Sequence, residues 1–403
     1  MSRLRLVTLA GNPDREAEVA AVLASHAGTD LLMRCMDRVE LLAAMRGGGI
    51  DAIVSVGAPE WFDASSAEEA ARGNLPVVGV VGDASEADRL GRLGASLLPS
   101  DATAEEIVAR CLSSEPELPT TRPSSQPSAP DGRLIAVWGP KGAPGRSSLA
   151  MELAYEIAAA EDATLLIDGD PFGGDLLQML GIAEEVPTVV WAASMAAKDE
   201  LDAARLELDL RRSSPRGPIV LPGLPRAELW PDISEFGWRQ LLTVARSSFS
   251  STICDSGFSL EGVDAGHVAN GTERNRMTRM ALAEADRVVA VCRSDPIGIK
   301  NFLWAFEDLV RVIDPEKVRI VANKVTRGDE RVVGGLIRKH LGKHPVAYVP
   351  DDPTAFATAV REGKTLREIS PGGAVPTAMR ALCASLGAPV KRRGLMTRLA
   401  GSR

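Results

Sequence analysis

A chain of 403 residues exceeds one ordinary domain, and two domains with separate cores are expected. Its 46 basic and 54 acidic side chains give a formal net charge of -8, which argues against a broad nucleic-acid-binding face. No apolar run approaches the roughly 20 residues that span a bilayer, and the first residues turn polar too soon for a secretory signal. The 5 cysteines include no CxxC pair, which favours reduced thiols over a disulfide framework or a zinc site. We therefore expect a cytoplasmic protein.

Residues 1–112 predict a small domain in which strands and helices alternate. Apolar runs rich in β-branched residues indicate five strands, at 4–10, 30–36, 50–56, 75–81 and 95–99. Helical patterns separate some of these runs and follow the last one. This alternation predicts a doubly wound parallel sheet.

In order and length these elements resemble the receiver domain of two-component signalling. Receivers carry a phosphoacceptor aspartate after the third strand, where this chain has Ser55, Val56 and Gly57. The acidic pair that follows the first strand of receivers is missing, and Leu98 replaces the lysine that precedes the proline after strand five. The resemblance therefore implies a pseudo-receiver that docks or dimerises and is not phosphorylated on aspartate.

A linker and a larger domain follow. Residues 113–132 are rich in Pro and Ser and lack apolar periodicity, which predicts a semi-extended linker. Residues 133–388 again alternate strands with helical segments. The strands are expected at 133–139, 164–170, 218–223, 251–257, 286–292, 318–324 and 346–350. The predicted fold class is therefore α/β, with two doubly wound parallel sheets.

A glycine-bearing turn connects the strand at 133–139 to a helical pattern that follows it. The turn reads Lys141, Gly142, Ala143, Pro144, Gly145, Arg146, Ser147 and Ser148. In the context of strand, loop and helix, consecutive N–H groups and the start of the helix can converge on a phosphate, while a cation and a hydroxyl manage charge and Mg²⁺. Taken alone, such a sequence is often only a turn.

Polar side chains lie at the ends of three further predicted strands. Asp168 and Asp170 end one, Asp255 lies near the end of another, and Asn323 lies near the end of a third. Because the carboxyl ends of parallel strands share one edge of a sheet, we expect these side chains to lie beside the phosphate loop. Singly, each is also compatible with an ordinary strand-end acid or turn former.

Together and in this order, the motifs resemble the deviant Walker A ATPases of the MinD and ParA type. The resemblance implies ATP and Mg²⁺ as cofactors. Phosphate-binding positions would be Gly142, Ala143, Gly145, Arg146, Ser147 and Ser148. The adenine would contact Asn323, Pro350 and Asp352, and Mg²⁺ would contact Ser147, Asp168 and Asp255. Catalytic roles would fall to Lys141, which reaches the nucleotide of the partner subunit in a homodimer, and Asp170, which positions the attacking water.

The loop departs from the family pattern at several positions. Arg146 stands where the family has the lysine that contacts the β and γ phosphates, and a planar guanidinium cannot follow a path shaped for an ammonium. Pro144 has no N–H to donate, and Pro140 and Ala143 replace glycines. We predict nucleotide binding with weak or absent hydrolysis. A pseudo-ATPase that binds no nucleotide remains the alternative.

The order of pseudo-receiver, linker and MinD-like domain resembles the CpaE and TadZ proteins and the actinobacterial septum-site-determining relatives. It implies a spatial regulator that positions pilus, secretion or division machinery at a cell pole or division site, with partners bound through the N-terminal domain. A nucleotide-independent scaffold is a second hypothesis. Partition on DNA, as by ParA, is a third, and the acidic balance makes nucleic-acid binding unlikely.

Residues 389–403 form a basic tail. If the tail is helical, Leu395, Met396 and Leu399 share one side with cationic flanks, as in an interfacial membrane anchor, and MinD proteins carry a resembling tail. This predicts peripheral contact with the inner face of the cell membrane. A disordered basic end that aids solubility fits the sequence equally well.

Overall fold

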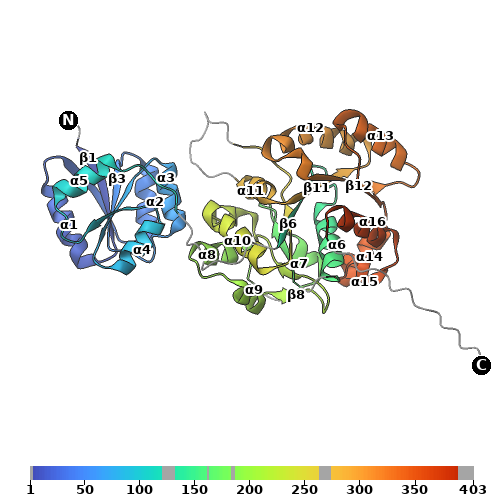
Figure 1. The fold of residues 1–403 in the computed structure, drawn as a ribbon, viewed down its shortest axis with the longest axis horizontal. Helices are drawn as coiled ribbons and strands as arrows, with labels where there is room; N and C mark the ends of the chain where they lie inside the picture. Colours follow the sequence, from blue (N-terminus) through green and yellow to red (C-terminus); the bar gives the residue numbers. More distant parts are fainter. Residues whose placement is uncertain (1–2, 120–131, 161–162, 183–186, 263–273, 389–403) are drawn as a thin grey trace, which may run out of the picture.

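The computed structural model describes residues 3–119, 132–160, 163–182, 187–262 and 274–388. These residues contain two sheets, each flanked by helices (Figure 1). The predicted α/β class with two doubly wound sheets is confirmed. The basic tail at 389–403 and the central part of the linker lie outside the described residues.

The first sheet and its helices, residues 3–113, are called the N-terminal domain here. All five strands are parallel, in the order β2-β1-β3-β4-β5. They are β1 (Leu4–Ala10), β2 (Thr29–Cys35), β3 (Ala52–Val56), β4 (Val77–Val81) and β5 (Ser96–Pro99). The helices are α1 (Pro13–Ser25), α2 (Arg38–Gly47), α3 (Ala64–Arg72), α4 (Ala84–Arg92) and α5 (Ala104–Ser113). Separate apolar clusters fill the space on the two faces, which is why the strands read as almost continuous apolar runs.

The second sheet belongs to the larger domain and has the strand order β13-β12-β11-β6-β10-β7-β9-β8. Its parallel strands are β6 (Arg133–Trp138), β7 (Thr164–Gly169), β9 (Ile219–Leu221), β10 (Ser251–Ser256), β11 (Arg287–Arg293), β12 (Val318–Val325) and β13 (Ala347–Pro350). They correspond to the seven predicted strands. The edge strand β8 (Arg211–Arg212) was not predicted, and it runs antiparallel to β9.

Helices cover both faces of the larger sheet. One face carries α6 (Arg146–Ala158), α7 (Leu176–Met179), α14 (Pro353–Glu362), α15 (Leu366–Ile369) and α16 (Ala374–Ser385). The other carries α8 (Val189–Ala197), α9 (Ala203–Asp209), α10 (Glu235–Ser248), α11 (Arg276–Glu284), α12 (Pro296–Val312) and α13 (Glu330–Leu341). Two 3₁₀ turns, Ala227–Asp232 and Pro315–Lys317, complete the described elements. Every residue of α6 from Leu149 to Ala158 is buried, so the helix that follows the glycine-bearing loop is held firmly in place.

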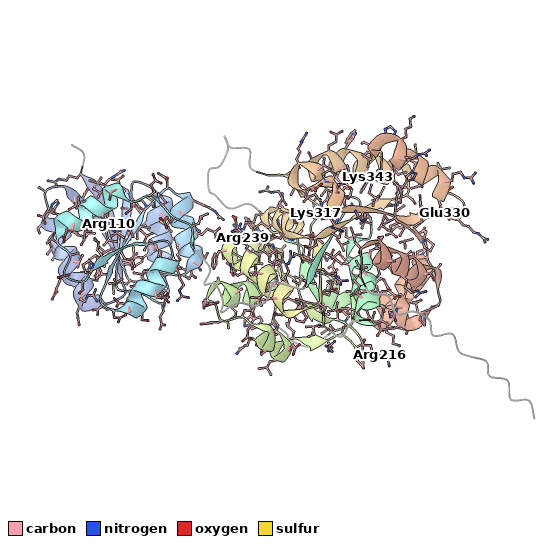
Figure 2. All side chains as sticks on the ribbon, in the orientation of Figure 1. Arg110, Arg216, Arg239, Lys317, Glu330 and Lys343 are labelled. Carbon is pink, nitrogen blue, oxygen red and sulfur yellow. The ribbon has the colours of Figure 1, made fainter. Side chains whose placement is uncertain are left out.

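The two domains meet where α3 contacts the start of α10 (Figure 1). Glu68 is only 4% exposed, and its carboxylate accepts a hydrogen bond from the N–H of Phe236 at 3.0 Å. Arg72 pairs with Glu68 in its own helix and with Glu235 across the junction. Arg239, one turn further along α10, also pairs with Glu235 and lies on the side of the larger domain that faces the N-terminal domain (Figure 2). Both domains therefore supply charge partners to the first turn of α10.

Helix α10 also reaches the end of β7. The ring of Trp238 is buried, and its Nε1 donates a hydrogen bond to the carbonyl of Met277 in α11 at 3.1 Å. A Cβ on Gly169 would lie 2.9 Å from Cys254 Sγ and 3.2 Å from this ring, so a glycine there leaves room for both side chains at the end of β7. Gly169 lies between Asp168 and Asp170, and α10 thus connects the domain junction with the predicted site.

Replacing Glu68 with Ala is expected to loosen the contact between α3 and α10, because the Phe236 N–H and Arg72 both lose a buried acceptor, at about 1–3 kcal/mol. The measurement is small-angle scattering of the full chain, in which the radius of gyration should increase. Glu69→Ala is the control, since the partner of Glu69 is Arg46 within the same domain. Equal radii for the two variants would contradict this role of Glu68.

Candidate functional site

The loop between β6 and α6 has an unusual backbone. Gly142 and Gly145 have φ values of +104° and +93°, a region that favours glycine. Ala143 also has a positive φ, of +50°, which costs on the order of 1 kcal/mol or more for a residue with a side chain. Ala143 stands where the resembling family has a glycine, and its backbone keeps the positive φ that a glycine would adopt easily. The loop therefore retains a tight, strained turn.

Four carbonyl groups of this loop each accept a hydrogen bond from a side chain. The pairs are Arg146 Nη1 with Gly139 O (3.2 Å), Arg293 Nη1 with Gly142 O (3.4 Å), Lys324 Nζ with Ala143 O (3.4 Å), and Asn323 Nδ2 with Pro144 O (2.7 Å). In a planar trans peptide the N–H points away from the C=O. The N–H groups of Ala143 and Gly145 therefore face away from the side chains that hold Gly142 O and Pro144 O. The two other peptides end in proline nitrogens and contribute no donor.

The start of α6 adds further N–H groups to this loop. Gly145 is its N-cap residue, and no side chain caps the helix there. The first-turn N–H groups of Arg146, Ser147 and Ser148 have no acceptor within the helix, since such groups lie ahead of the first helical carbonyls. The combination of loop amides and an uncapped helix start is a binding site for an anion.

A cavity of about 520 Å³ opens over the loop. It is lined by seven of the residues predicted to bind nucleotide, namely Ala143, Gly145, Arg146, Ser147, Ser148, Asn323 and Pro350. Gly142 belongs to the loop but does not line the cavity. Asp352 does not line it either, because its side chain caps α14 by accepting a hydrogen bond from the Ala355 N–H at 3.0 Å. Its neighbours Asp351 and Pro353 line the cavity instead, together with Phe356.

Three buried polar atoms at this site have no hydrogen-bond partner among the described residues. They are Arg146 Nε, Asp255 Oδ1 and Asn323 Oδ1. Buried polar atoms are almost always partnered, because an unmet hydrogen bond costs about 1–3 kcal/mol. A donor and two acceptors left open around one loop indicate that the site is built for a polar ligand.

Asp168 and Asp255 form a buried carboxylate pair. They face each other in register across β7 and β10, with exposed fractions of 1% and 2%. Burial raises the pKa of Asp168 to about 7, although the hydrogen bonds that its carboxylate accepts from the N–H groups of Leu176 and Asp170 act to lower the pKa. Burial, and then the charge of Asp168, raises the pKa of Asp255 well above its usual range, while the hydroxyl of Ser147 lowers it. Two such acids can ionise together only when a cation neutralises them.

The residues present fit Mg²⁺ held partly by a bound ligand. No cluster of three or more His, Cys, Asp or Glu residues suited to a metal ion occurs in the described ranges. Asp168, Asp255 and the Ser147 hydroxyl remain as oxygen ligands, and the open Oδ1 of Asp255 provides one coordination position. Mg²⁺ is commonly bound by one or two carboxylates plus phosphate oxygens and water, so a phosphate ligand would complete this site.

The structure also pairs two predicted residues with each other. Arg146 Nη2 lies 3.2 Å from Asp170 Oδ2, and both side chains are largely buried. No sequence pattern predicted this ion pair directly, although an arginine in place of a lysine beside an acid-bearing strand is compatible with it. Lys141 is exposed in the loop.

Solved structures share the fold of the larger domain. A ParA family ATPase from Chlorobium tepidum TLS superposes with a TM-score of 0.53 and 19% identity, over 62% of this chain and 98% of that chain. The cell division ATPase MinD of Pyrococcus furiosus superposes with a TM-score of 0.49 and 16% identity, over 64% of this chain and 98% of that chain. The septum site-determining protein MinD complexed with Mg-ADP, from Pyrococcus horikoshii OT3, superposes with a TM-score of 0.48 and 14% identity, over 63% of this chain and 96% of that chain. No family model and no curated protein matches the chain. At these identities the likeness shows the fold alone.

Asp168→Asn is expected to reduce the pH dependence of stability. The folded-state pKa near 7 exceeds the unfolded value near 4, so the folded chain retains a proton that the unfolded chain releases. The free energy of unfolding of the natural chain should therefore fall between pH 4 and pH 7, by about 1.4 kcal/mol per unit at the steepest, and stay low above pH 7.

The test is urea unfolding at pH 5 and pH 8, with a chelator present. Asp168→Asn should shrink the difference between the two pH values, whereas Asp329→Asn, an exposed change at the start of α13, should leave it unchanged. The same difference in both variants would rule out Asp168 as the titrating group.

Proposed function

We propose that this protein is an ATP-binding, dimerising spatial regulator of the MinD and ParA type with weak or absent ATP hydrolysis. The observation that carries the proposal is the set of open polar atoms, Arg146 Nε, Asp255 Oδ1 and Asn323 Oδ1, around one strained loop. A donor for phosphate, an acceptor for a cation and an acceptor for a base are the groups that a nucleoside triphosphate with Mg²⁺ needs. The shared fold with a ParA family ATPase supports the same assignment.

The phosphates would bind the N–H groups of the loop and of the first turn of α6, with Arg146 as the counter-charge. Ser147, Asp168 and Asp255 would hold Mg²⁺, which would neutralise part of the phosphate charge when bound. The raised pKa values of both aspartates mean that binding the cation releases protons. Gly142 would contribute to the shape of the loop more than to direct contact.

The base would be read by Asn323. Its Nδ2 is committed to Pro144 O, which leaves Oδ1 as the open group. An acceptor matches the exocyclic amino group of adenine and faces the carbonyl oxygen of guanine unfavourably. Pro350 and Phe356 line the same cavity and offer apolar surface to the base. Asp352 would act indirectly, by capping the helix that carries Phe356.

As a switch, the bound nucleotide would stabilise a homodimer in which Lys141 of each subunit reaches the partner's nucleotide, as in the resembling family. The N-terminal domain, which lacks phosphoacceptor residues, would recruit pilus, secretion or division proteins. None of the described helices has the length and apolar character needed to cross a membrane. The apolar and basic residues of the tail at 389–403 would make the membrane contact, as a peripheral anchor.

A scaffold that uses no nucleotide is the second candidate function. The Arg146–Asp170 ion pair and the two proline nitrogens of the loop favour it, because they remove charge and donors from the anion site. Partition on DNA is the weaker alternative, given the net charge of -8.

Labelled ATP with Mg²⁺ is expected to bind saturably and at least about tenfold more tightly than GTP. GTP would set the carbonyl oxygen of its guanine against the open acceptor of Asn323, and this repulsion lowers its affinity. Competition between the two nucleotides at equilibrium gives the ratio. Asn323→Ala should reduce the preference for ATP. Absence of saturable binding at millimolar ATP would favour the scaffold.

Lys141→Ala is expected to reduce ATP-dependent dimerisation and to leave the fold intact, since Lys141 is exposed. Light scattering with and without MgATP gives the mass of the particle. Lys198→Ala, at the exposed end of α8, is the matched control and should dimerise like the natural chain. A dimer mass that is unchanged in Lys141→Ala would argue against a role across the interface.

A further inference from the structure

The guanidinium group of Arg146 is held by three neighbours. Nη1 donates to the carbonyl of Gly139 at 3.2 Å, and Nη2 lies 3.2 Å from Asp170 Oδ2. The group also lies over the ring of Phe258, 5.9 Å from the ring centroid, and Phe258 packs on Phe172 with centroids 4.8 Å apart. Only 14% of the Arg146 side chain is exposed, so its position is determined by these contacts rather than by solvent.

Asp170 has both oxygens engaged. Oδ2 pairs with Arg146, and Oδ1 accepts a hydrogen bond from the Phe172 N–H at 2.9 Å. The other two carboxylates at this edge of the sheet, Asp168 and Asp255, are almost fully buried and are suited to a cation. Asp170, with 15% exposure, is therefore the most accessible carboxylate of these three, and the arginine pairs with it.

A lysine at position 146 could not make the same set of contacts. A guanidinium has several nitrogens in a fixed planar fork, so it can bond a loop carbonyl and a carboxylate while it stacks on an aromatic ring. A lysine has one ammonium nitrogen and no planar group, so it cannot make all three contacts in this geometry. The arginine, in contrast, still has Nε without a partner among the described residues. One donor of the guanidinium is thus not committed to Asp170 or to Gly139.

We propose that Arg146 is a positioning residue that lets the site hold a nucleoside triphosphate while it keeps Asp170 away from the attacking water. In hydrolysis, water forms a bond to the γ phosphorus, the bond to the bridging oxygen breaks with its electrons on the diphosphate, and a proton of the water passes to an acceptor. The family resemblance places Asp170 beside this water, and the ion pair with Arg146 would then occupy the acceptor. This inference rests on the proposed function, since it presupposes that a triphosphate binds.

The test measures single-turnover hydrolysis of MgATP by the full chain and its variants, with fluorescent-nucleotide binding measured on the same samples. Arg146→Lys should hydrolyse about 100-fold faster than the natural chain, the size of a general-base contribution. Adding Asp170→Asn to Arg146→Lys should return the rate to that of the natural chain. Arg311→Lys, an exposed change on α12, is the control and should have no effect.

The outcomes separate the two proposals. Suppose that all variants bind the nucleotide. This inference would be overturned, and the proposed function would stand, if the hydrolysis rate did not rise in Arg146→Lys or if it stayed raised in the double variant. Absence of binding in all of them would overturn the proposed function and this inference with it.

The ion pair can also be measured without nucleotide, by a double-mutant cycle on the free energy of unfolding. The double variant Arg146→Lys, Asp170→Asn should lose less stability than the sum of the single variants. Additive losses would mean that the two side chains do not interact in solution, and the inference would fail.

Discussion

Four carbonyl groups in the loop before α6 are each held by a side chain, one from α6 itself and three from the neighbouring strands β11 and β12, and the direction of the loop amides depends on this arrangement. A peptide that presents its carbonyl to one side presents its N–H to the other. Donors from β11 and β12 therefore fix the direction of loop amides that lie far away in sequence. The close approach of Asn323 is part of the same constraint, because a Cβ on Gly145 would lie 2.4 Å from its Nδ2.

Much of the fold could be predicted because the strands of a parallel sheet covered on both faces are nearly continuous apolar runs. The edge strand β8 has two residues and offers no such pattern. The shared edge of Asp168, Asp255 and Asn323 also followed from the parallel arrangement. The exact pairing of these residues did not follow, because the register that sets Asp168 opposite Asp255 is decided by packing. The sequence also leaves open whether the side chain of Asp352 caps α14 or contacts a ligand, and in the structure it caps the helix.

The departures of the loop from its family pattern act on different parts of the site. Ala143 retains a left-handed backbone, so the turn keeps its shape at an energetic cost. Pro140 and Pro144 remove donors without displacing the carbonyls beside them. Arg146 was the hardest to anticipate, since its charge alone predicts a phosphate contact. Its rotamer, its carboxylate partner and the ring of Phe258 became known only from the three-dimensional arrangement.

The shared cap of α10 also determines which piece of this chain can stand for the whole. Excision of the larger domain would leave the Phe236 N–H without its carboxylate and Glu235 without Arg72, at the start of the helix whose Trp238 packs against β7. During synthesis the N-terminal domain emerges first, and its α3 is already available when the start of α10 is made. The first domain thus completes the polar contacts of the first turn of α10, and a larger domain expressed alone would keep only the Ser234 cap and the Arg239–Glu235 pair there.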